Sequence, residues 1–143
     1  MPSLRYVTSD QIRFHCELSF PPRQIEHYRF LYVESGQGQF RIADDRFEVS
    51  AGWLGLLSPG LRENHYVDSE PVSYLFVEFA TPERLIRPHF AEFTFSDPQR
   101  SALVWLLRTI DHQRSDHDGC LLSAALRLMF PEDRASTASR GSN

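Results

Sequence analysis

The sequence between residues 28 and 79 is a succession of short apolar segments separated by turn-forming residues. The segments are rich in aromatic and β-branched side chains, which favour strands. They span residues 28–33, 39–42, 46–49, 53–57 and 72–79. The turns lie at Gly36-Gln37-Gly38, Asp44-Asp45, Ala51-Gly52 and Ser58-Pro59-Gly60. Short strands with turns at intervals of about 8–12 residues predict a β-sandwich or barrel.

The residues before this region are harder to assign. Residues 12–18 alternate apolar and polar side chains, which predicts a first strand. Residues 1–9 show no period, and they are either an arm lying on the barrel or a loose terminus.

The residues after this region change to helical spacing. Asp97-Pro98 is an N-cap residue followed by a proline suited to a first turn, so a helix is expected from there to about Arg114-Ser115. Asp118 is expected to cap a second helix, which Pro131 ends. Residues 131–143 are small, polar and charged, and we expect them to be disordered.

Length and composition limit the possible classes of protein. A chain of 143 residues is expected to form one domain, and its eleven Phe, five Tyr and two Trp suit a mainly β core. The formal net charge of -4 argues against direct binding of nucleic acid. Cys16 and Cys120 form no disulfide framework, and the sequence has neither an apolar signal core nor a membrane-length apolar stretch. We therefore expect a cytoplasmic protein without membrane contact.

A family resemblance rests on an ordered set of these residues. The set comprises Gly36-Gln37-Gly38, Phe47, Gly52, Pro59-Gly60, His65-Tyr66 and Val77-Glu78-Phe79. It resembles the cupin-type sensor domain of AraC-family transcription regulators, well over roughly Arg23 to Ala80 and loosely over the two helices. The resemblance implies a cupin-like (jelly-roll) β-barrel followed by two C-terminal α-helices. It also implies a small-molecule effector-binding and dimerisation domain without enzymatic activity.

The expected organisation has three parts. Residues 1–96 are the sensor barrel with its N-terminal arm, residues 97–130 are a helical dimerisation or linker segment, and residues 131–143 are the tail. No helix-turn-helix pattern follows the sensor, so DNA would be contacted only through a separate or missing domain. The chain is then a fragment, a truncated product or a free-standing sensor.

The sequence departs from the pattern of metal-binding cupins. Alignment on the turn glycines puts Arg29 where those proteins carry a glutamate ligand, and Glu63 where they carry a histidine. An arginine does not ligate a metal ion and repels one. We therefore expect no metal, no cofactor and no catalytic residue.

Arg29 is the leading candidate for a ligand contact. Residues two apart on a strand share a face, which places His27 with Arg29 and places Tyr74, Phe76 and Glu78 together. Arg29 either pairs with Glu78 across the barrel and fills space, or presents its planar fork to a ligand. Both roles are compatible if the ligand replaces Glu78.

The remaining candidate contacts rest on the resemblance. His65 corresponds to a histidine at the mouth of the pocket, and Tyr74 and Phe76 correspond to positions that touch or stack on the effector. Together with Arg29, His27 and Glu78 they form the predicted binding set. The effector is expected to be a sugar, a carboxylate or an aromatic acid.

The first helix is the candidate for dimerisation. Leu103, Leu106, Leu107 and Ile110 form an apolar stripe, and Val104 and Trp105 widen it beyond one face. The stripe either packs within the monomer or pairs with a second copy. The resemblance favours a homodimer, because such sensors commonly pair through a helix of this kind.

Two other functions remain open. One is a small stand-alone cupin enzyme, an isomerase or a dioxygenase, which the departure from the metal pattern disfavours. The other is a free-standing sensor or interaction module that modulates other regulators through mixed dimers.

Overall fold

The computed structural model describes residues 3–14, 23–42, 45–60, 62–66, 71–86, 90–92 and 96–130. Within these ranges the strands are β1 (Arg5–Phe14), β2 (Arg23–Gln24), β3 (Tyr28–Ser35), β4 (Gln37–Ile42), β5 (Asp45–Ser50), β6 (Leu54–Leu57), β7 (Arg62–Tyr66), β8 (Val72–Ala80) and β9 (Phe90–Glu92). The helices are α1 (Asp97–Gln113) and α2 (Cys120–Met129), with a 3₁₀ turn at His117–Gly119 between them. The strands predicted between residues 28 and 79 and both predicted helices are present. The predicted tail, residues 131–143, lies outside the described residues.

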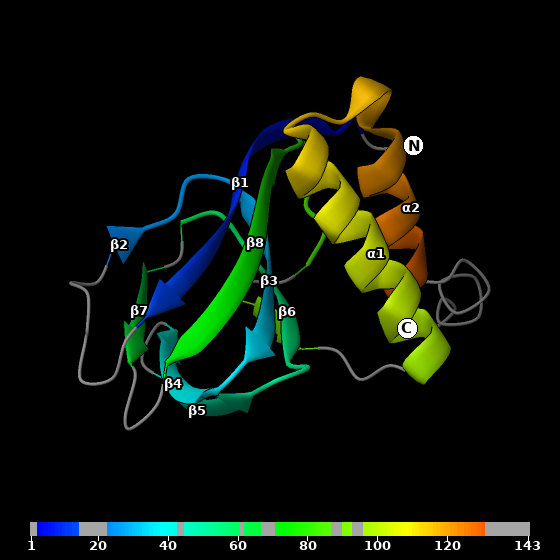
Figure 1. Cartoon of the computed structure of the whole chain (residues 1–143). Helices are drawn as coiled ribbons and strands as arrows, with labels where there is room; N and C mark the ends of the chain where they lie inside the picture. The colour runs from blue at the N-terminus through cyan, green and yellow to red at the C-terminus, as the bar shows by residue number, and fades with distance from the viewer. Residues whose placement is uncertain are drawn as a thin grey trace, which may run out of the picture.

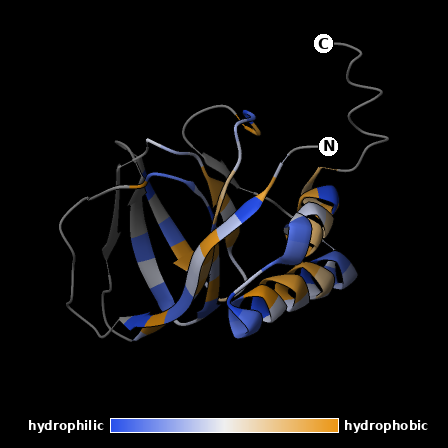
Figure 2. Cartoon of the chain, turned by 90° about the horizontal axis from the view of Figure 1, so that it is seen from above, coloured by the Kyte–Doolittle hydropathy of each residue, from blue (hydrophilic) through white to orange (hydrophobic). Residues whose placement is uncertain are grey.

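The described strands form two antiparallel sheets, and both helices cover the outer side of the larger one (Figure 1). The larger sheet has the order β1-β8-β3-β6-β9, and the smaller sheet has the order β2-β7-β4-β5. Seen from above, the helices lie beside the barrel, and hydrophobic residues recur along each of them (Figure 2). The predicted fold class, a mainly β jelly-roll barrel followed by two helices, is confirmed.

Strand β8 separates the two parts of the apolar core. Leu75, Val77 and Phe79 are fully buried on the side that faces the helices. The helices contribute Leu103, Leu106, Leu107, Ile110, Leu122, Ala125, Leu126 and Met129 to the same cluster. Tyr74 and Phe76 point the other way and belong to a second cluster, inside the barrel. Successive side chains of a strand point to opposite faces, so the two rows seen in the sequence belong to the two clusters.

Strand β1 begins at Arg5, which differs from the prediction of a strand over residues 12–18. Residues 5–9 are not an arm: they pair with β8, with Arg5 opposite Ala80 and Ser9 opposite Val77. The strand pattern is hidden because the register shifts between Tyr6 and Thr8, and because a serine occupies a buried position. Residues 15–18 of the predicted strand lie outside the described residues.

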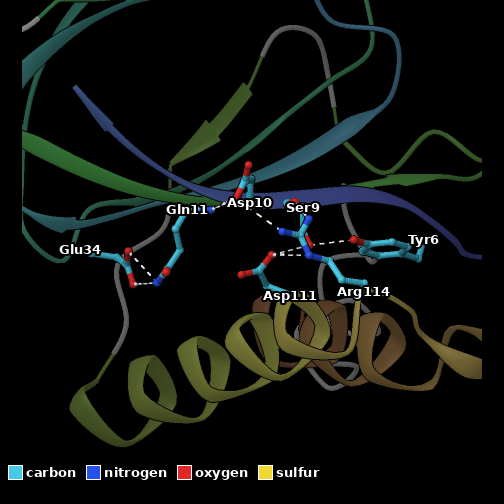
Figure 3. A network of polar contacts seen from close by, with 7 residues as sticks. All are labelled: Tyr6, Ser9, Asp10, Gln11, Glu34, Asp111 and Arg114. Atoms are coloured by element: carbon cyan, nitrogen blue, oxygen red, sulfur yellow. Dashed lines mark hydrogen bonds and ion pairs between the residues drawn. The ribbon is translucent and has the colours of Figure 1, made fainter.

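A polar network joins β1 to the end of α1 (Figure 3). Ser9, which is almost fully buried, donates from Oγ to Asp111 Oδ1 at 2.7 Å and lies 2.8 Å from the Tyr6 hydroxyl. The Arg114 guanidinium donates to the Ser9 carbonyl oxygen, and its Nη2 lies 3.6 Å from Asp10 Oδ1. The buried serine hydroxyl thus has partners, which removes most of the penalty of placing it in the core.

A second set of contacts lies further along the same seam. Gln11 Nε2 donates to both carboxylate oxygens of Glu34, at 3.2 and 3.1 Å. Arg108 of α1 donates to Glu34 Oε2 at 3.2 Å. Because the Arg108 side chain is largely exposed, this ion pair adds little stability. The apolar cluster holds α1 on the sheet, and the polar contacts border it.

The N-terminus of α1 is capped by Ser96 rather than Asp97. Ser96 Oγ accepts from the Gln99 amide at 3.3 Å, and Gln99 Oε1 accepts from the Ser96 amide at 3.1 Å, which completes a capping box. Asp97 lies in the first turn, where a negative charge favours the helix dipole. The helix ends at Gln113 with Arg114 as its C-cap residue, close to the predicted end at Arg114-Ser115.

The start of α2 also differs from the prediction. Asp116, not Asp118, holds the first turn, because its carboxylate accepts from the amides of Leu121 and Leu122 at 2.9 and 2.7 Å. Asp118 has a left-handed φ of 53° within the 3₁₀ turn and makes no such bond. The two aspartates are close together in the sequence. The backbone path of the turn determines which carboxylate accepts from the first amides of α2.

Gly36 is required by a close approach between two chain segments. Its φ is +87°, and a Cβ at this position would lie 2.2 Å from the Pro71 carbonyl oxygen. We expect Gly36→Ala to lower the free energy of unfolding by at least about 2 kcal/mol, because backbone strain and a clash with backbone atoms combine.

Gly52→Ala is the matched control for this measurement. Gly52 has a similar φ of +99°, but no atom lies within 4 Å of its would-be Cβ. Strain alone should cost about 1 kcal/mol there. Urea denaturation of both variants measures their free energies of unfolding. An equal decrease in the two variants would show that Gly36 does not approach Pro71 closely.

Candidate functional site

Three of the predicted site residues meet inside the barrel. Arg29 on β3 stands directly opposite Glu78 on the neighbouring β8, and Phe76 follows on the same row. This face of the larger sheet points toward the smaller sheet, because its cluster includes Val49 of β5. Tyr74 continues the row on β8, opposite Val33.

The Arg29–Glu78 contact is a buried ion pair. Arg29 Nε donates to Glu78 Oε2 at 2.9 Å, and Arg29 Nη2 donates to the same oxygen. The Arg29 side chain is 4% exposed and the Glu78 side chain is 12% exposed. The pairing that the sequence suggested is present, but it joins adjacent strands of one sheet and does not cross the barrel. Removing one partner of a buried pair leaves an uncompensated charge, which costs about 3–5 kcal/mol.

Phe76 supports the arginine from the same row. The centre of the guanidinium lies 4.8 Å from the centroid of the Phe76 ring, within the range of a cation–π contact. An aromatic face and a carboxylate therefore hold the planar fork of Arg29 in a defined orientation.

An apolar cluster lies on the barrel side of the larger sheet, and it includes Phe76 beside Arg29. Members of the interior cluster are Ile25, Leu31, Val33, Val49, Leu57, Val72, Tyr74 and Phe76, with Ile12 and Trp53 packed against it. The sequence analysis placed Val49 and Leu57 on strands without assigning them to the interior. Their burial depends on how the two sheets face each other, and no local signal in the sequence shows this.

Of the two predicted histidines, only His27 has a described side chain, and no hydrogen bond or ion pair between described residues joins it to this group. His27 is half-buried and lies in the bend before β3. His65 lies on β7 in the smaller sheet, with its backbone opposite Phe40 of β4. The side chain of His65 is outside the described residues, so its role in the predicted binding set stays a prediction.

The predicted dimerisation stripe packs within the chain. Leu103, Leu106, Leu107 and Ile110 are all buried in the cluster between the helices and the larger sheet. Trp105 on the same helix is 62% exposed. Trp105, and not the stripe, is therefore the large apolar side chain that α1 exposes to solvent.

A separate groove of about 580 Å³ lies outside the barrel. It is bounded by residues 3–6 at the start of β1 and by the turn between α1 and α2. Glycine is required in this turn because a Cβ on Gly119 would lie 2.8 Å from the Leu4 carbonyl oxygen. The groove is a seam between these segments and contains none of the predicted site residues.

The two facing antiparallel sheets, with an apolar cluster and the Arg29–Glu78 pair between them, define a cupin-type barrel. A model of the family described as the AraC-like ligand binding domain matches residues 15–129. The chain belongs to that family, as the resemblance in the sequence predicted. No curated protein matches the chain.

Solved structures share this fold at low sequence identity. YhaK from Escherichia coli is similar with a TM-score of 0.54 and 19% identity, over 65% of this chain and 44% of YhaK. A predicted oxalate decarboxylase from Thermotoga maritima has a TM-score of 0.50 and 14% identity, over 52% of this chain and 67% of that protein. The DMSP lyase DddQ from Ruegeria pomeroyi has a TM-score of 0.50 and 14% identity, over 57% of this chain and 41% of DddQ. At these identities the likeness shows the fold alone.

Within the described residues, no group of three or more His, Cys, Asp or Glu side chains is arranged to hold a metal ion. Neither α1 nor α2 has the length and apolar character needed to cross a bilayer.

The absence of a bound metal stays a prediction. The alignment on the turn glycines puts Arg29 where metal-binding cupins carry a ligand, and Glu78 and Phe76 hold its positive charge there. We expect elemental analysis of gently purified protein to find less than about a tenth of a metal ion per chain. One iron, zinc, manganese or nickel ion per chain would contradict this expectation.

Proposed function

We propose that this chain is the small-molecule effector-binding domain of an AraC-type transcription regulator. The observation that carries the proposal is a buried, oriented arginine beside an apolar cluster in the barrel interior. The match to a ligand-binding family supports it. Pockets that bind small molecules are mostly apolar with a few well-placed polar groups, and this combination matches that description.

The proposed contacts come from β3 and β8. Arg29 and Glu78 provide the charged groups, and Tyr74 and Phe76 provide aromatic surface on the same row. His27 and His65 complete the proposed set from the bend before β3 and from the opposite sheet. The other face of β8 packs on the helices, so a ligand on one side of this strand lies one layer away from α1.

We propose a role in binding and not in catalysis. Some structures with this fold are named as enzymes, including the DMSP lyase DddQ from Ruegeria pomeroyi, but identities of 14% show the fold alone. Arg29, paired with Glu78, replaces a metal ligand by a cation. In this proposal DNA is contacted through a separate helix-turn-helix domain, because a net charge of -4 does not favour phosphate binding.

We place the protein in the cytoplasm. Cys120 is a free, exposed thiol, which agrees with a reducing compartment. Cys16 lies outside the described residues.

A thermal-shift panel tests the binding proposal. We expect at least one class among neutral monosaccharides, aliphatic carboxylates and aromatic carboxylates to raise the Tm of the purified chain. The double variant Arg29→Met/Glu78→Leu should bind that class at least tenfold more weakly, because a charge-assisted hydrogen bond contributes about 1.5–3 kcal/mol. Replacing both charges together avoids leaving one of them buried alone.

Arg13→Met is the control for this panel, because Arg13 is exposed on β1. It should leave the Tm shift unchanged. A panel without any shift, or a shift that survives in the double variant, would contradict a binding site at Arg29.

We also propose that the domain forms a homodimer through α1. Since the predicted stripe of Leu103, Leu106, Leu107 and Ile110 is buried within the monomer, its part in a dimer is to hold α1 in place. The contact with the second copy is then made by Trp105, which is the large hydrophobic side chain that this helix exposes. In a twofold interface the same helix meets its own copy, so one substitution acts twice.

Sedimentation at tens of micromolar tests the dimer. We expect the unmodified chain to sediment as a dimer and Trp105→Glu to sediment as a monomer with an unchanged circular dichroism spectrum. Leu107→Asp should unfold the chain instead of dividing a dimer, because Leu107 is fully buried.

Arg127→Glu on the exposed part of α2 is the charge-change control, and it should stay dimeric. An unmodified chain that is monomeric at this concentration would contradict dimerisation by this domain alone.

A further inference from the structure

We infer that the effector is an amphiphilic carboxylate, and that Glu78 is an internal competitor which occupies the Arg29 fork until the effector replaces it. This inference rests on the proposed function and adds the chemical class of the ligand and a means of controlling its affinity. It follows from the geometry of the ion pair, the burial of its two partners and the chemistry of the surrounding side chains.

The geometry of the pair uses only one carboxylate oxygen. Arg29 Nε and Nη2 both donate to Glu78 Oε2. These two nitrogens form one edge of the guanidinium, and that edge matches the two oxygens of a carboxylate in parallel, bidentate fashion. An incoming carboxylate that places one oxygen on each nitrogen therefore makes a better pair than the one Glu78 makes. Because Glu78 uses only one of its oxygens, a ligand that uses two can replace it.

The two partners are held to different degrees. The Arg29 side chain is 4% exposed and lies 4.8 Å from the Phe76 ring, so the sheet and the aromatic face fix it in place. The Glu78 side chain is 12% exposed and has no described contact besides Arg29. A carboxylate that already reaches solvent loses less on leaving the pair than a deeply buried one, because it regains hydration. Arg29 is thus the fixed part of the site, and Glu78 is the part that moves.

The side chains around the pair favour a carboxylate over a sugar. A cluster of apolar and aromatic side chains lies on the same side of the sheet as Arg29, with Leu31 and Leu57 among the most completely buried. A sugar carries hydroxyl groups on all sides, and each buried hydroxyl without a partner costs free energy. A carboxylate on an aliphatic or aromatic body needs one cation at one end and apolar contact elsewhere. Arg29 and this cluster supply those two requirements.

Competition by Glu78 lowers the apparent affinity of the unmodified site. When the binding-competent state is only a fraction of the population, the apparent Kd rises in proportion to the inverse of that fraction. Removing the negative charge of Glu78 while keeping its shape should therefore tighten the binding of anions. The affinity of a neutral ligand should not change, because such a ligand carries no net charge that Arg29 attracts.

Calorimetric titration with defined probes tests this inference. Benzoate and hexanoate serve as aromatic and aliphatic carboxylates, and benzamide and D-glucose serve as neutral probes. We expect Glu78→Gln to bind at least one of the two carboxylates ten times or more tightly than the unmodified chain does. Benzamide binding should be unchanged by this substitution, and Arg29→Met/Glu78→Leu should bind neither carboxylate.

Glu78→Gln could destabilise the fold, so a second variant and a second measurement test the inference independently of that effect. Glu78→Asp keeps the charge on a shorter side chain and should show an intermediate gain in carboxylate affinity. If Glu78→Gln is only partly folded, the same carboxylate should raise its Tm more than it raises the Tm of the unmodified chain, because the anion takes the place that the Glu78 carboxylate leaves beside Arg29.

Three results would overturn the inference. The first is equal carboxylate affinity, or equal absence of binding, in the unmodified chain, Glu78→Gln and Glu78→Asp. The second is a gain for benzamide as large as the gain for benzoate, which would show a change of shape and not of charge. The third is D-glucose binding that weakens in Glu78→Gln, which would leave the proposed function standing and make the effector a polyol. The proposed function itself fails separately, when no compound of the wider thermal-shift panel binds.

Discussion

The two-sided burial of β8 is the constraint on which the rest of the structure depends. One row of its side chains, Leu75, Val77 and Phe79, holds the helices on the sheet. The other row, with Tyr74 and Phe76, lines the barrel interior. A strand buried on both faces cannot slip by one residue without exchanging the rows, so its register with β1 and β3 is strongly specified. The positions of the helices and of the interior site are therefore set by the same strand.

The charged pair is the exception in this apolar arrangement. Replacing a buried ion pair by apolar side chains of similar volume is often neutral or stabilising, so Arg29 and Glu78 are weak candidates for a purely structural role. The cation–π contact with Phe76 orients the guanidinium and adds to the case for recognition. A fixed arginine beside an apolar wall is suited to a ligand with one anionic end, and the family to which the chain belongs is named for ligand binding.

The accuracy of the sequence prediction depended on how local each signal is. Glycine turns and alternation are properties of neighbouring residues, and they identified β3, β4, β5, β6 and β8. The helical period identified α1 and α2. Strand β1 was misplaced because a bulge interrupts its alternation, and the buried Ser9 is satisfied by Asp111, which lies far away in the sequence. The cap of α2 was misassigned for a similar reason, since Asp116 and Asp118 differ only in where the turn directs them.

The sequence by itself determined the family, the barrel with its two helices, and the face of each strand that carries Arg29 and Phe76. These follow from periodicity, turn chemistry and residue type along short stretches of chain. The tertiary structure alone decided that Glu78 is the direct neighbour of Arg29, and that the Leu107 stripe is buried while Trp105 faces outward. These outcomes depend on the register between β3 and β8 and on the docking of α1, which are set by contacts between segments that are distant in the sequence.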